Sequence, residues 1–423
     1  MPLPQLRPHR PEIDGHRLLT RLRELATIGA DPRGGVTRLG FSAEDCQGVT
    51  YVADRAAKAG LVPAVDQAGN LIIRRARADP TLPALLMGSH LDTVVRAGPL
   101  DGAYGVIAAL DVLQTLAEHA VPLRYEPAVA AFANEEGALF PCPFWGSLAL
   151  SGRLTRTPDD LRDRSGASLR EPLRAVGGDP DSVADARWPA GSIGAYLELH
   201  IEQGPALERS GNRIGVVEGI TGRTVLSVTV HGTAGHAGTV PMDHRADALT
   251  AAARIVLAVE EVARRRLCTV ATVGRLRVEP DAVNVIPGAV RMTAEVRDLS
   301  ARRLRDAQAA LDVAVAQVAA DTGTRIQVEV ADRCPAAATD SGLRAAIAAA
   351  AAELTLPCLH LPSGAGHDAQ VIASVAPIGM IFVPSLGGVS HVPEESTADA
   401  DLVAGAQVLL GAALRVGAVV PTN

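Results

Sequence analysis

The 423-residue sequence is poor in aromatic side chains, which make up only 3% of it. Its hydrophobic fraction is nevertheless 48%. The core must therefore be built mainly from Ala, Val, Leu and Ile, which suit helices packed closely on a sheet. A chain of this length also exceeds what one hydrophobic core usually supports. We expect an α/β protein with two domains.

Lysine is almost absent, and Lys58 is the only one in the chain. Enzyme classes that need a Schiff-base lysine or a phosphate-binding lysine have this one candidate, and it lies in no recognisable motif. The net charge is −7, with acids and bases scattered along the sequence. Proteins that bind nucleic acid concentrate Lys and Arg on one face instead. We therefore expect no nucleic-acid partner.

Cysteine is scarce as well, with five in the chain. They are odd in number and widely spaced, and no two form a Cys-x-x-Cys pair. This pattern favours a reduced, cytoplasmic location. The N-terminal residues include no apolar stretch of signal-peptide length. The apolar segment 402–420 approaches the length of a membrane span, but Gln407 and Arg415 interrupt it. We expect a packed terminal helix there and no membrane partner.

Helix and strand patterns alternate in the first third of the chain. Helical periodicity covers 16–28, 44–59 and 101–120, and strand-like runs cover 70–76, 83–90 and 126–133. This alternation predicts a parallel or mixed sheet, and active sites of such sheets gather at the carboxyl ends of the strands.

The pattern changes at about residue 223 to strand, helix, strand, strand, helix, strand. The expected segments, in order, are 224–232, 245–267, 269–278, 289–298, 301–320 and 325–330. This β-α-β-β-α-β order is the split motif of a ferredoxin-like sandwich. It is complete within about 110 residues, an ordinary domain size. We predict an inserted ferredoxin-like domain at 223–334, while 1–222 and 335–423 together form the other domain.

Histidines and carboxylates gather in five short clusters at the expected strand ends. In GSHLDTV, His90 and Asp92 are two residues apart. Alternate side chains of an extended segment face the same way, so the Asp92 carboxylate can orient the His90 imidazole. In GPLDGAYG, Asp101 stands among glycines, which let the backbone approach a ligand closely. The alternative for Asp101 is a helix N-cap.

The other three clusters contain the remaining candidates. In FANEEGALF, Glu135 and Glu136 adjoin, so in extended chain one carboxylate can bind metal while the other faces a substrate. The alternative is a solvated acidic turn. In AYLELHIEQGP, His200 alternates with apolar residues, which places it on the polar, exposed face of a strand. His391 lies in LGGVSHVPEES, a glycine-rich loop that could also be an ordinary turn.

Together the clusters offer three imidazoles and several carboxylates, with no cysteine among them. Nitrogen and oxygen ligands of this kind suit Zn²⁺, and also Mn²⁺, Co²⁺ or Ni²⁺. Five potential ligands are too many for one catalytic zinc with an open position. They suit two divalent metal ions that share a bridging carboxylate.

The sequence resembles the hydantoinase/carbamoylase family of two-metal amidohydrolases over nearly its whole length. The family is related to the co-catalytic zinc aminoacylases and exopeptidases. The motifs that carry the resemblance occur in the family's order: GSHLDTV, LDGAYG, NEEG, LELHIEQGP, GTAGHAGTVPMDHRADA, NVIPG, EVRD, SGAGHDA and SHVPEE. LELHIEQGP and HAGTVPM separate this family from its peptidase relatives, which usually carry an acid at the position of His200.

The resemblance implies two metal ions in a mixed-sheet catalytic domain. One ion would be held by His90, Asp101 and His200. The second would be held by Asp101, Glu136 and His391, so that Asp101 bridges the pair.

The resemblance also implies roles for residues around the metal ions. Glu135 would be the general base, Asp92 would support His90, and His236 would stabilise the developing oxyanion. The inserted domain would act as a lid and as the dimerisation domain of a homodimer, in which His236 enters the partner subunit's site. The substrate-binding residues would be Gln203, His236, Asn284 and Arg297.

Arg297 is also a candidate from the pattern alone. In RMTAEVRD it alternates with apolar residues and lies at a strand end on the open face. A planar guanidinium there can bind a carboxylate in bidentate fashion. The alternative is a surface salt bridge with a neighbour such as Asp298.

The family implies hydrolysis of a non-peptide C–N bond in a linear amide or amidine. We favour an N-carbamoyl-L-amino acid, which would yield the amino acid, carbon dioxide and ammonia, with allantoate as the alternative. Leu139 stands where the family usually has Arg, and Phe140 and PCPFWGS follow it. This apolar replacement leaves the ligand set intact but makes a different ureido or amide substrate more credible.

Two alternative functions, a metal-free binding protein and a peptidase-type enzyme, make different predictions about the sequence. A metal-free binding protein on the same fold predicts a broken ligand set, whereas all five ligand positions hold competent side chains. A dipeptidase or aminoacylase is disfavoured by His200.

Overall fold

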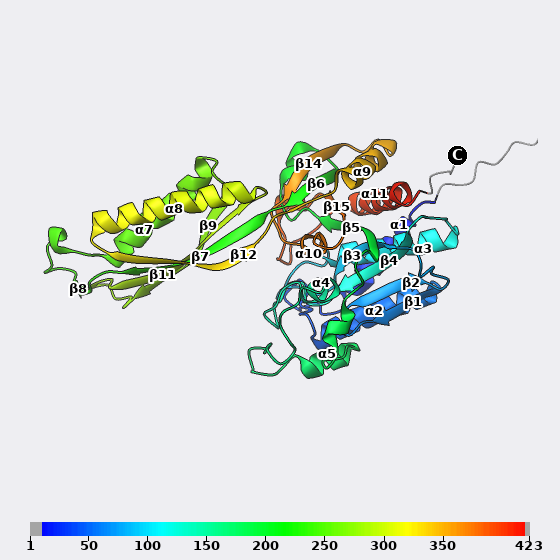
Figure 1. The fold of residues 1–423 in the computed structure, drawn as a ribbon, viewed down its shortest axis with the longest axis horizontal. Coiled ribbons are helices and arrows are strands. Elements are labelled where there is room, and N and C mark those ends of the chain that lie inside the picture. The colour runs from blue at the N-terminus through cyan, green and yellow to red at the C-terminus, as the bar shows by residue number, and fades with distance from the viewer. Residues whose placement is uncertain (1–10, 419–423) are drawn as a thin grey trace, which may run out of the picture. The chain divides into compact units, whose positions relative to one another are not determined.

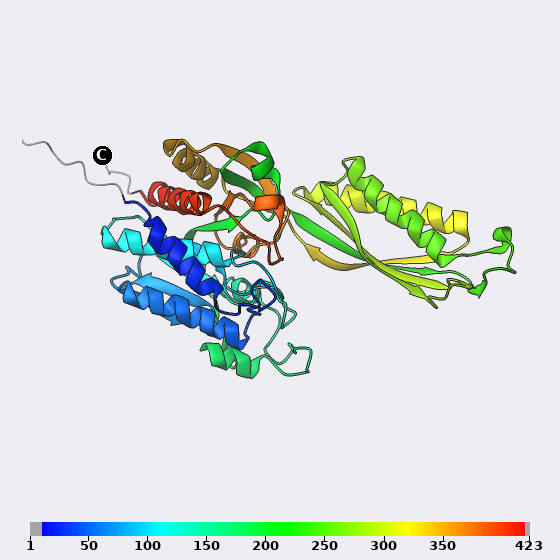
Figure 2. The same ribbon diagram turned by 180° about the vertical axis from the view of Figure 1, so that it is seen from behind.

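The fold was analysed in a computed structural model that describes residues 11–418. Two compact units make up the described chain. Unit 2 is Gly219–Ala338, and unit 1 consists of the segments on either side of it. Figures 1 and 2 show the helices and strands of both units.

The larger sheet is mixed and has nine strands. They are β1 (Leu61–Val65), β2 (Leu71–Arg75), β3 (Ala84–His90), β4 (Glu126–Phe132), β5 (Ile193–Ile201), β6 (Ile214–Ile220), β13 (Ala337–Ala338), β14 (Cys358–Ser363) and β15 (Ile378–Val383). Their order is β1-β2-β4-β3-β5-β15-β6-β13, with β14 paired to β6. The neighbours β4, β3, β5 and β15 run parallel to one another, so their carboxyl ends meet at one edge.

Helices surround this sheet in unit 1. They are α1 (Gly15–Ala26), α2 (Ala43–Lys58), α3 (Ala103–Glu118), α4 (Trp145–Leu150), α5 (Arg170–Val176), η1 (Val183–Ala186), α6 (Ala206–Ser210), α9 (Ser341–Glu353), α10 (Asp368–Ile372), η3 (Leu386–Gly388) and α11 (Asp399–Val416). α3 is buried along most of its length because it packs on β3, β4 and β5 and is covered by α1 and α11.

Small side chains allow the helices of unit 1 to pack closely, as the low aromatic content predicts. A side chain at Gly405 of α11 would begin 2.4 Å from the Tyr104 hydroxyl, and one at Gly105 of α3 would begin 2.3 Å from the Leu199 carbonyl oxygen. Larger residues would force these helices away from the sheet. The surrounding core consists mainly of Ala, Val, Leu and Ile, which confirms the expectation from composition.

Unit 2 contains a four-stranded antiparallel sheet and two long helices. The elements are β7 (Gly222–His231), α7 (Ala248–Arg264), β9 (Val270–Glu279), β11 (Ala289–Asp298), α8 (Ala301–Thr322) and β12 (Arg325–Cys334), with β8 (Gly235–His236), η2 (Met242–His244) and β10 (Val285–Ile286) between them. The strand order is β12-β7-β11-β9. Alternate residues such as Val228 and Met292 face the helices in one core, whereas Arg291 and Glu295 lie on the opposite face.

Several segment boundaries differ from those expected, among them those of two helices. The helix expected at 245–267 is shorter, because Asp247 caps α7 by accepting hydrogen bonds from the main-chain N–H groups of Leu249 and Thr250. The apolar segment 402–420 contains most of α11, which packs against α3, α9 and β15. Within 11–418, no helix is both long enough and apolar enough to cross a bilayer.

Candidate metal centre

Two histidines from neighbouring parallel strands meet an aspartate at the carboxyl edge of the large sheet. His90 is the last residue of β3, His200 lies at the end of β5, and Asp101 precedes α3. One possible ligand atom from each of these side chains lies within 4.8 Å of the others. His200 Nε2 lies 3.2 Å from Asp101 Oδ1. All three side chains are buried.

A second group of possible ligands shares Asp101. Its other members are Glu136, which follows β4, and His391, which lies between η3 and α11. His391 Nε2 lies 2.9 Å from Asp101 Oδ2 and 3.3 Å from Glu136 Oε1. One carboxylate oxygen of Asp101 thus faces His200 and the other faces His391. This arrangement suits a bridging ligand.

Main-chain carbonyl groups fix the orientation of both buried imidazoles. His90 Nδ1 lies 2.9 Å from the Asp92 carbonyl oxygen, and His200 Nδ1 lies 2.9 Å from that of Ile201. A carbonyl oxygen only accepts hydrogen bonds, so Nδ1 must carry the proton in each ring. The Nε2 atoms of the neutral rings are then free of a proton, as a metal ligand must be.

Gly102 allows the chain to pass close to His90. A β-carbon at this position would lie 2.4 Å from His90 Nε2, and the backbone has a positive φ of 65°. Only glycine satisfies both conditions without strain. Gly102 also occupies the N-cap position of α3, and no side chain caps this helix. Asp101 is therefore not the helix cap that its sequence context allowed.

Asp92 contacts its neighbours differently from the sequence prediction. Its carboxylate Oδ1 lies 3.7 Å from His90 Nδ1, beyond hydrogen-bond distance, because the Asp92 carbonyl oxygen is the acceptor. The carboxylate instead accepts hydrogen bonds from the main-chain N–H groups of Glu135 and Glu136, at 3.0 and 3.1 Å. Asp92 therefore holds the paired glutamates in place as well as His90.

Glu135 and Glu136 do not lie in extended chain. They follow the end of β4 in a turn where Asn134 has a positive φ of 53°. The expectation that the two carboxylates point to opposite sides is wrong, because both face the cluster. Glu135 Oε2 lies 3.8 Å from His90 Nε2, and Glu136 contacts His391. Glu135 is only 7% exposed, so this is not a solvated acidic turn.

The carboxylates and imidazoles perturb one another's proton affinity. Burial raises the pKa of Glu135 well above its usual value, and the charges of Glu136 and Asp368 raise it further. Hydrogen bonds that His391 donates to the Asp101 and Glu136 carboxylates raise its pKa to about 10. Burial lowers the pKa of His90, but the Asp92 and Asp101 charges outweigh it and raise the value to about 9. The site therefore stabilises positive charge strongly, which is the condition for binding divalent cations.

His200 is not on an exposed strand face, contrary to the sequence prediction. β5 lies between β3 and β15, and its two faces are both covered, so His200 is 1% exposed. The polar residues that alternate along β5 form a buried network instead of a solvated surface. Glu198 accepts hydrogen bonds from the Ser89 and Tyr196 hydroxyls and from the Ala369 N–H.

Two residues near the possible metal ligands were not identified from the sequence. The His367 ring lies 4.6 Å from the His200 ring, centroid to centroid, and Glu198, His200 and His367 form a further group of possible ligands. Glu395 accepts hydrogen bonds from the main-chain N–H groups of Leu100 and Asp101, which orients the shared carboxylate. SGAGHDA and SHVPEE contain these residues, but neither motif has a ligand spacing that distinguishes them.

The four predicted substrate-binding residues lie in different units. Gln203, in unit 1, donates a hydrogen bond to Asp101 Oδ1 at 3.0 Å. His236 and Asn284 are neighbours in unit 2, where β8 pairs with β10 and the Ala237 N–H donates to the Asn284 carbonyl oxygen. Arg297 is the next-to-last residue of β11 and forms an ion pair with Glu295. The salt-bridge alternative for Arg297 is therefore present, with Glu295 in place of Asp298.

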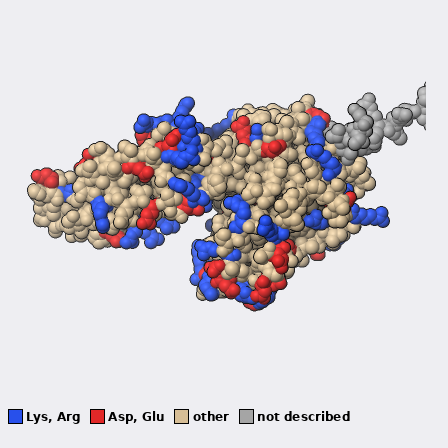
Figure 3. Space-filling view, viewed as in Figure 1, with Lys and Arg blue, Asp and Glu red and all other residues tan. Residues whose placement is uncertain are grey.

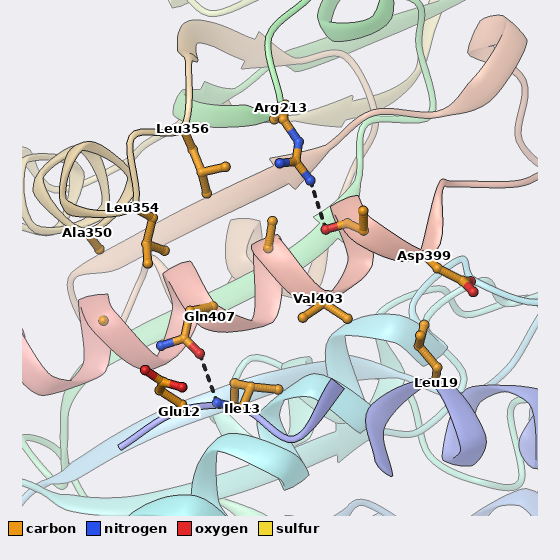
Figure 4. Close-up of a pocket in the computed structure, with 13 residues that line it drawn as sticks. Glu12, Ile13, Leu19, Arg213, Ala350, Leu354, Leu356, Asp399, Val403 and Gln407 are labelled. Carbon is orange, nitrogen blue, oxygen red and sulfur yellow. Dashed lines mark hydrogen bonds between the residues drawn. The ribbon is translucent and has the colours of Figure 1, made fainter. Parts of the chain in front are cut away.

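A separate groove of about 790 Å³ runs along α11, and it contains none of the predicted site residues. Leu19, Leu354, Leu356 and Val403 line it (Figure 4). Its polar groups are largely paired within the protein: Gln407 accepts a hydrogen bond from the Ile13 N–H, and Arg213 pairs with Asp401. The groove therefore offers no set of catalytic groups.

Replacing Asp92 with asparagine tests its contact with the glutamates. An amide nitrogen cannot accept a hydrogen bond, so Asp92→Asn should release one N–H of the Glu135–Glu136 turn. We expect kcat or metal affinity to fall on the order of 10–100-fold, as is common for residues that support metal ligands. Asp340→Asn is the control, because the Asp340 side chain accepts a hydrogen bond from the Leu343 N–H at the start of α9, away from the candidate ligands. Unchanged kinetics and metal content in Asp92→Asn would contradict the role.

The sequence profile of peptidase family M20/M25/M40 matches residues 86–415, which include all the clustered residues. The chain belongs to this family. Within the M20/M25/M40 family, it is 42% identical to the N-carbamoyl-L-amino acid amidohydrolase of Geobacillus stearothermophilus, over 94% of this chain and 97% of the relative. It is 37% identical to the allantoate amidohydrolase of Escherichia coli K12, over 91% of this chain and 94% of the relative.

A solved structure supports the same assignment. The hydantoinase/carbamoylase family amidase of Burkholderia multivorans has a TM-score of 0.89 and 36% sequence identity, and the alignment covers 96% of this chain and 98% of that one. The predicted resemblance to the hydantoinase/carbamoylase group of M20/M25/M40 enzymes is thus confirmed, as is a mixed α/β fold with a large mixed sheet.

Proposed function

We propose that this chain is a two-metal amidohydrolase that converts an N-carbamoyl-L-amino acid and water into the L-amino acid, carbon dioxide and ammonia. The observation that carries the proposal is the pair of ligand groups that share Asp101, with Glu135 beside them. The 42% identity to a carbamoyl-amino-acid amidohydrolase along nearly the whole of both chains supports the substrate class.

The donor atoms suit the proposed ions. His90, Asp101 and His200 would hold one ion through two nitrogens and one oxygen, and Asp101, Glu136 and His391 would hold the other through one nitrogen and two oxygens. Zn²⁺ fits this set well, and Mn²⁺, Co²⁺ and Ni²⁺ are compatible with it. When bound, the ions supply Lewis-acid chemistry that acidifies water and polarises the carbonyl group of the substrate.

Glu135 performs the proton transfers in this proposal. Its carboxylate lies 3.8 Å from His90 Nε2, beside the two ligand groups. It therefore takes a proton from the attacking water and gives it to the leaving nitrogen. Asp92 and the turn after β4 keep the Glu135 carboxylate beside His90 throughout.

Unit 2 serves as a ferredoxin-like lid and dimerisation domain in the proposal, as residues 223–334 were predicted to do. Its β-α-β-β-α-β element order and its strand order support this assignment. His236 and Asn284 would reach the substrate together, since β8 and β10 pair with each other. In a homodimer His236 would act on the partner's substrate, where it stabilises the oxyanion.

Arg297 would bind the substrate carboxylate, and its removal should weaken binding without altering the chemical step. We expect Arg297→Ala to raise KM at least about tenfold with a smaller change in kcat, since a charge-assisted hydrogen bond typically contributes about 1.5–3 kcal/mol. Arg291→Ala is the matched control on the same strand and face, where Arg291 pairs with Glu279. A similar KM in both variants would reject Arg297 as the carboxylate ligand.

Allantoate is the second candidate substrate, because allantoate amidohydrolases are also related over most of the chain. Leu139 is compatible with either substrate or with another ureido compound. It is partly buried and packs against the unit 1 core, so it adds apolar surface beside the turn that contains Glu135.

A substrate panel with ammonia detection tests the proposed function. It should contain N-carbamoyl-L- and D-amino acids, a β-ureido acid, allantoate and a dipeptide, each assayed with Zn²⁺, Mn²⁺, Co²⁺ and Ni²⁺. We expect the highest kcat/KM for an N-carbamoyl-L-amino acid. A higher value for allantoate would transfer the assignment to the second candidate, and peptide hydrolysis alone would refute both.

The cytoplasm stays the proposed location of the protein, because the cysteine pattern of the sequence favours a reduced compartment.

A further inference from the structure

Unit 2 contains a cavity of about 330 Å³ between the first turns of α8 and the end of the sheet where β7 begins and β12 ends. Cys334 of β12 pairs with Arg223 of β7 at this end of the sheet. The lining residues are Arg223, Thr224, Ala301, Leu304, Arg305, Gln308, Arg333, Cys334 and Pro335. Its volume is at the lower end of the range typical of small-molecule sites. None of the residues proposed for catalysis lines it.

Some of the basic side chains that line the cavity have no acidic partner among the described residues. No carboxylate is among its lining residues. Within the part of the chain that the structure describes, Arg305 and Arg333 form no ion pair. Arg333 donates a hydrogen bond to the neutral Gln308 side chain at 2.6 Å, whereas Arg223 is neutralised by Asp332. The two uncompensated guanidinium groups therefore favour an anion.

Further arginines lie on the two segments of unit 2 that meet at the start of α8. The Arg303 side chain donates a hydrogen bond to the Arg266 carbonyl oxygen, so the start of α8 lies beside the chain that follows α7. Figure 3 shows basic side chains gathered on this part of unit 2. The arginines of the two segments are Arg264, Arg265, Arg266, Arg302, Arg303 and Arg305. Three of them are neutralised by ion pairs, Arg264 with Glu260, Arg302 with Asp306 and Arg303 with Asp298, so the excess charge lies on the others. Clustered charge of one sign raises the local concentration of oppositely charged ligands.

The interior of the cavity is apolar, because Ala301, Leu304 and Pro335 contribute to its lining. A small inorganic ion would leave this apolar surface in contact with water. A carboxylate that carries a compact apolar group would cover the surface and also pair with Arg305 and Arg333. The lining therefore favours an organic carboxylate over a simple ion.

We propose that this cavity in unit 2 is a second ligand site, separate from the metal centre, which binds a small organic carboxylate through Arg305 and Arg333. The ligand's apolar group lies against Leu304 and Pro335. The site does not depend on the substrate proposed for the metal centre, because the two sites share no residue.

Alkylation of Cys334 provides a direct readout, since Cys334 lines the cavity and is not in a disulfide. The full-length protein is treated with iodoacetamide, which is uncharged, and labelling rates are followed by mass spectrometry of the Cys334 and Cys358 peptides. Phenylacetate should slow labelling of Cys334 in a saturable manner, whereas exposed Cys358 should be unaffected. Phenylacetamide and inorganic phosphate should each protect at least about tenfold more weakly, because one lacks the charge and the other the apolar group.

Arginine variants assign the protection to this cavity. Arg305→Ala/Arg333→Ala should weaken phenylacetate protection at least about tenfold. Arg302→Ala is the matched control, because Arg302 lies on the same helix, pairs with Asp306 and does not line the cavity. Saturation-transfer NMR with phenylacetate gives an independent measure of binding in each variant. Absence of protection in the parent protein, equal protection in the double variant, or equal protection by phosphate would overturn the proposal.

Discussion

Glu135→Gln is expected to lower kcat on the order of 10²–10⁴-fold while both metal ions stay bound. The amide has nearly the same shape as the carboxylate but cannot accept and return a proton. Glu135 lies 3.8 Å from His90 and belongs to neither ligand group that contains Asp101. Glutamine is a neutral replacement of the same shape, and burial already disfavours the charged form of Glu135. The melting temperature should therefore not fall.

The adjacent Glu136→Gln variant provides the matched comparison. Glu136 contacts His391 and belongs to a ligand group, so its neutralisation should lower the affinity for one ion as well as the activity. Ammonia release from an N-carbamoyl-L-amino acid gives the activity of each variant, and elemental analysis gives the metal content. Near-normal turnover in Glu135→Gln, or loss of metal from it, would refute its role as the general base.

Asp101→Ala is expected to abolish measurable activity and to empty both metal positions. Its two carboxylate oxygens face different histidines, His200 at 3.2 Å and His391 at 2.9 Å. A single truncation thus removes one ligand from each group, and each group is left with two protein ligands, fewer than a catalytic zinc usually has. Elemental analysis should give close to two ions per chain in the parent protein and well below one in the variant.

Comparison of His391→Ala with Asp101→Ala distinguishes a ligand that belongs to one metal group from a ligand that belongs to both. His391 belongs only to the group with Asp101 and Glu136, and its side chain is 45% exposed, so its loss should disturb the fold little. We expect this variant to retain about one ion, held by the remaining group of three ligands. Equal metal content in Asp101→Ala and His391→Ala would show that Asp101 does not bridge.

Local periodicity was sufficient to predict the elements that carry the site. The alternation of apolar and polar residues in 289–298 predicted the bounds of β11, and the apolar runs before His90 and Glu135 predicted β3 and β4. Parallel neighbours end at one edge of a sheet, so the clusters at these strand ends could be expected to converge. The family resemblance then supplied the ligand groups, which periodicity alone does not specify.

Tertiary contacts explain the features that the sequence did not predict. β5 has polar residues on one face, a pattern typical of a solvated strand, yet Ser89, Tyr196 and Ala369 satisfy its Glu198 in the interior. Likewise, the contact from Asp92 to the turn after β4 joins segments more than forty residues apart in sequence. No local pattern distinguishes a buried, fully hydrogen-bonded carboxylate from an exposed one.

The most direct test of the paired metal centre is a crystal structure of the metal-loaded enzyme with anomalous diffraction recorded at the absorption edge of the added metal. Two anomalous peaks are expected in each chain. One should contact His90, Asp101 and His200, and the other should contact Asp101, Glu136 and His391. A single peak, or peaks that lie away from Asp101 in a fully active preparation, would contradict the two-metal mechanism.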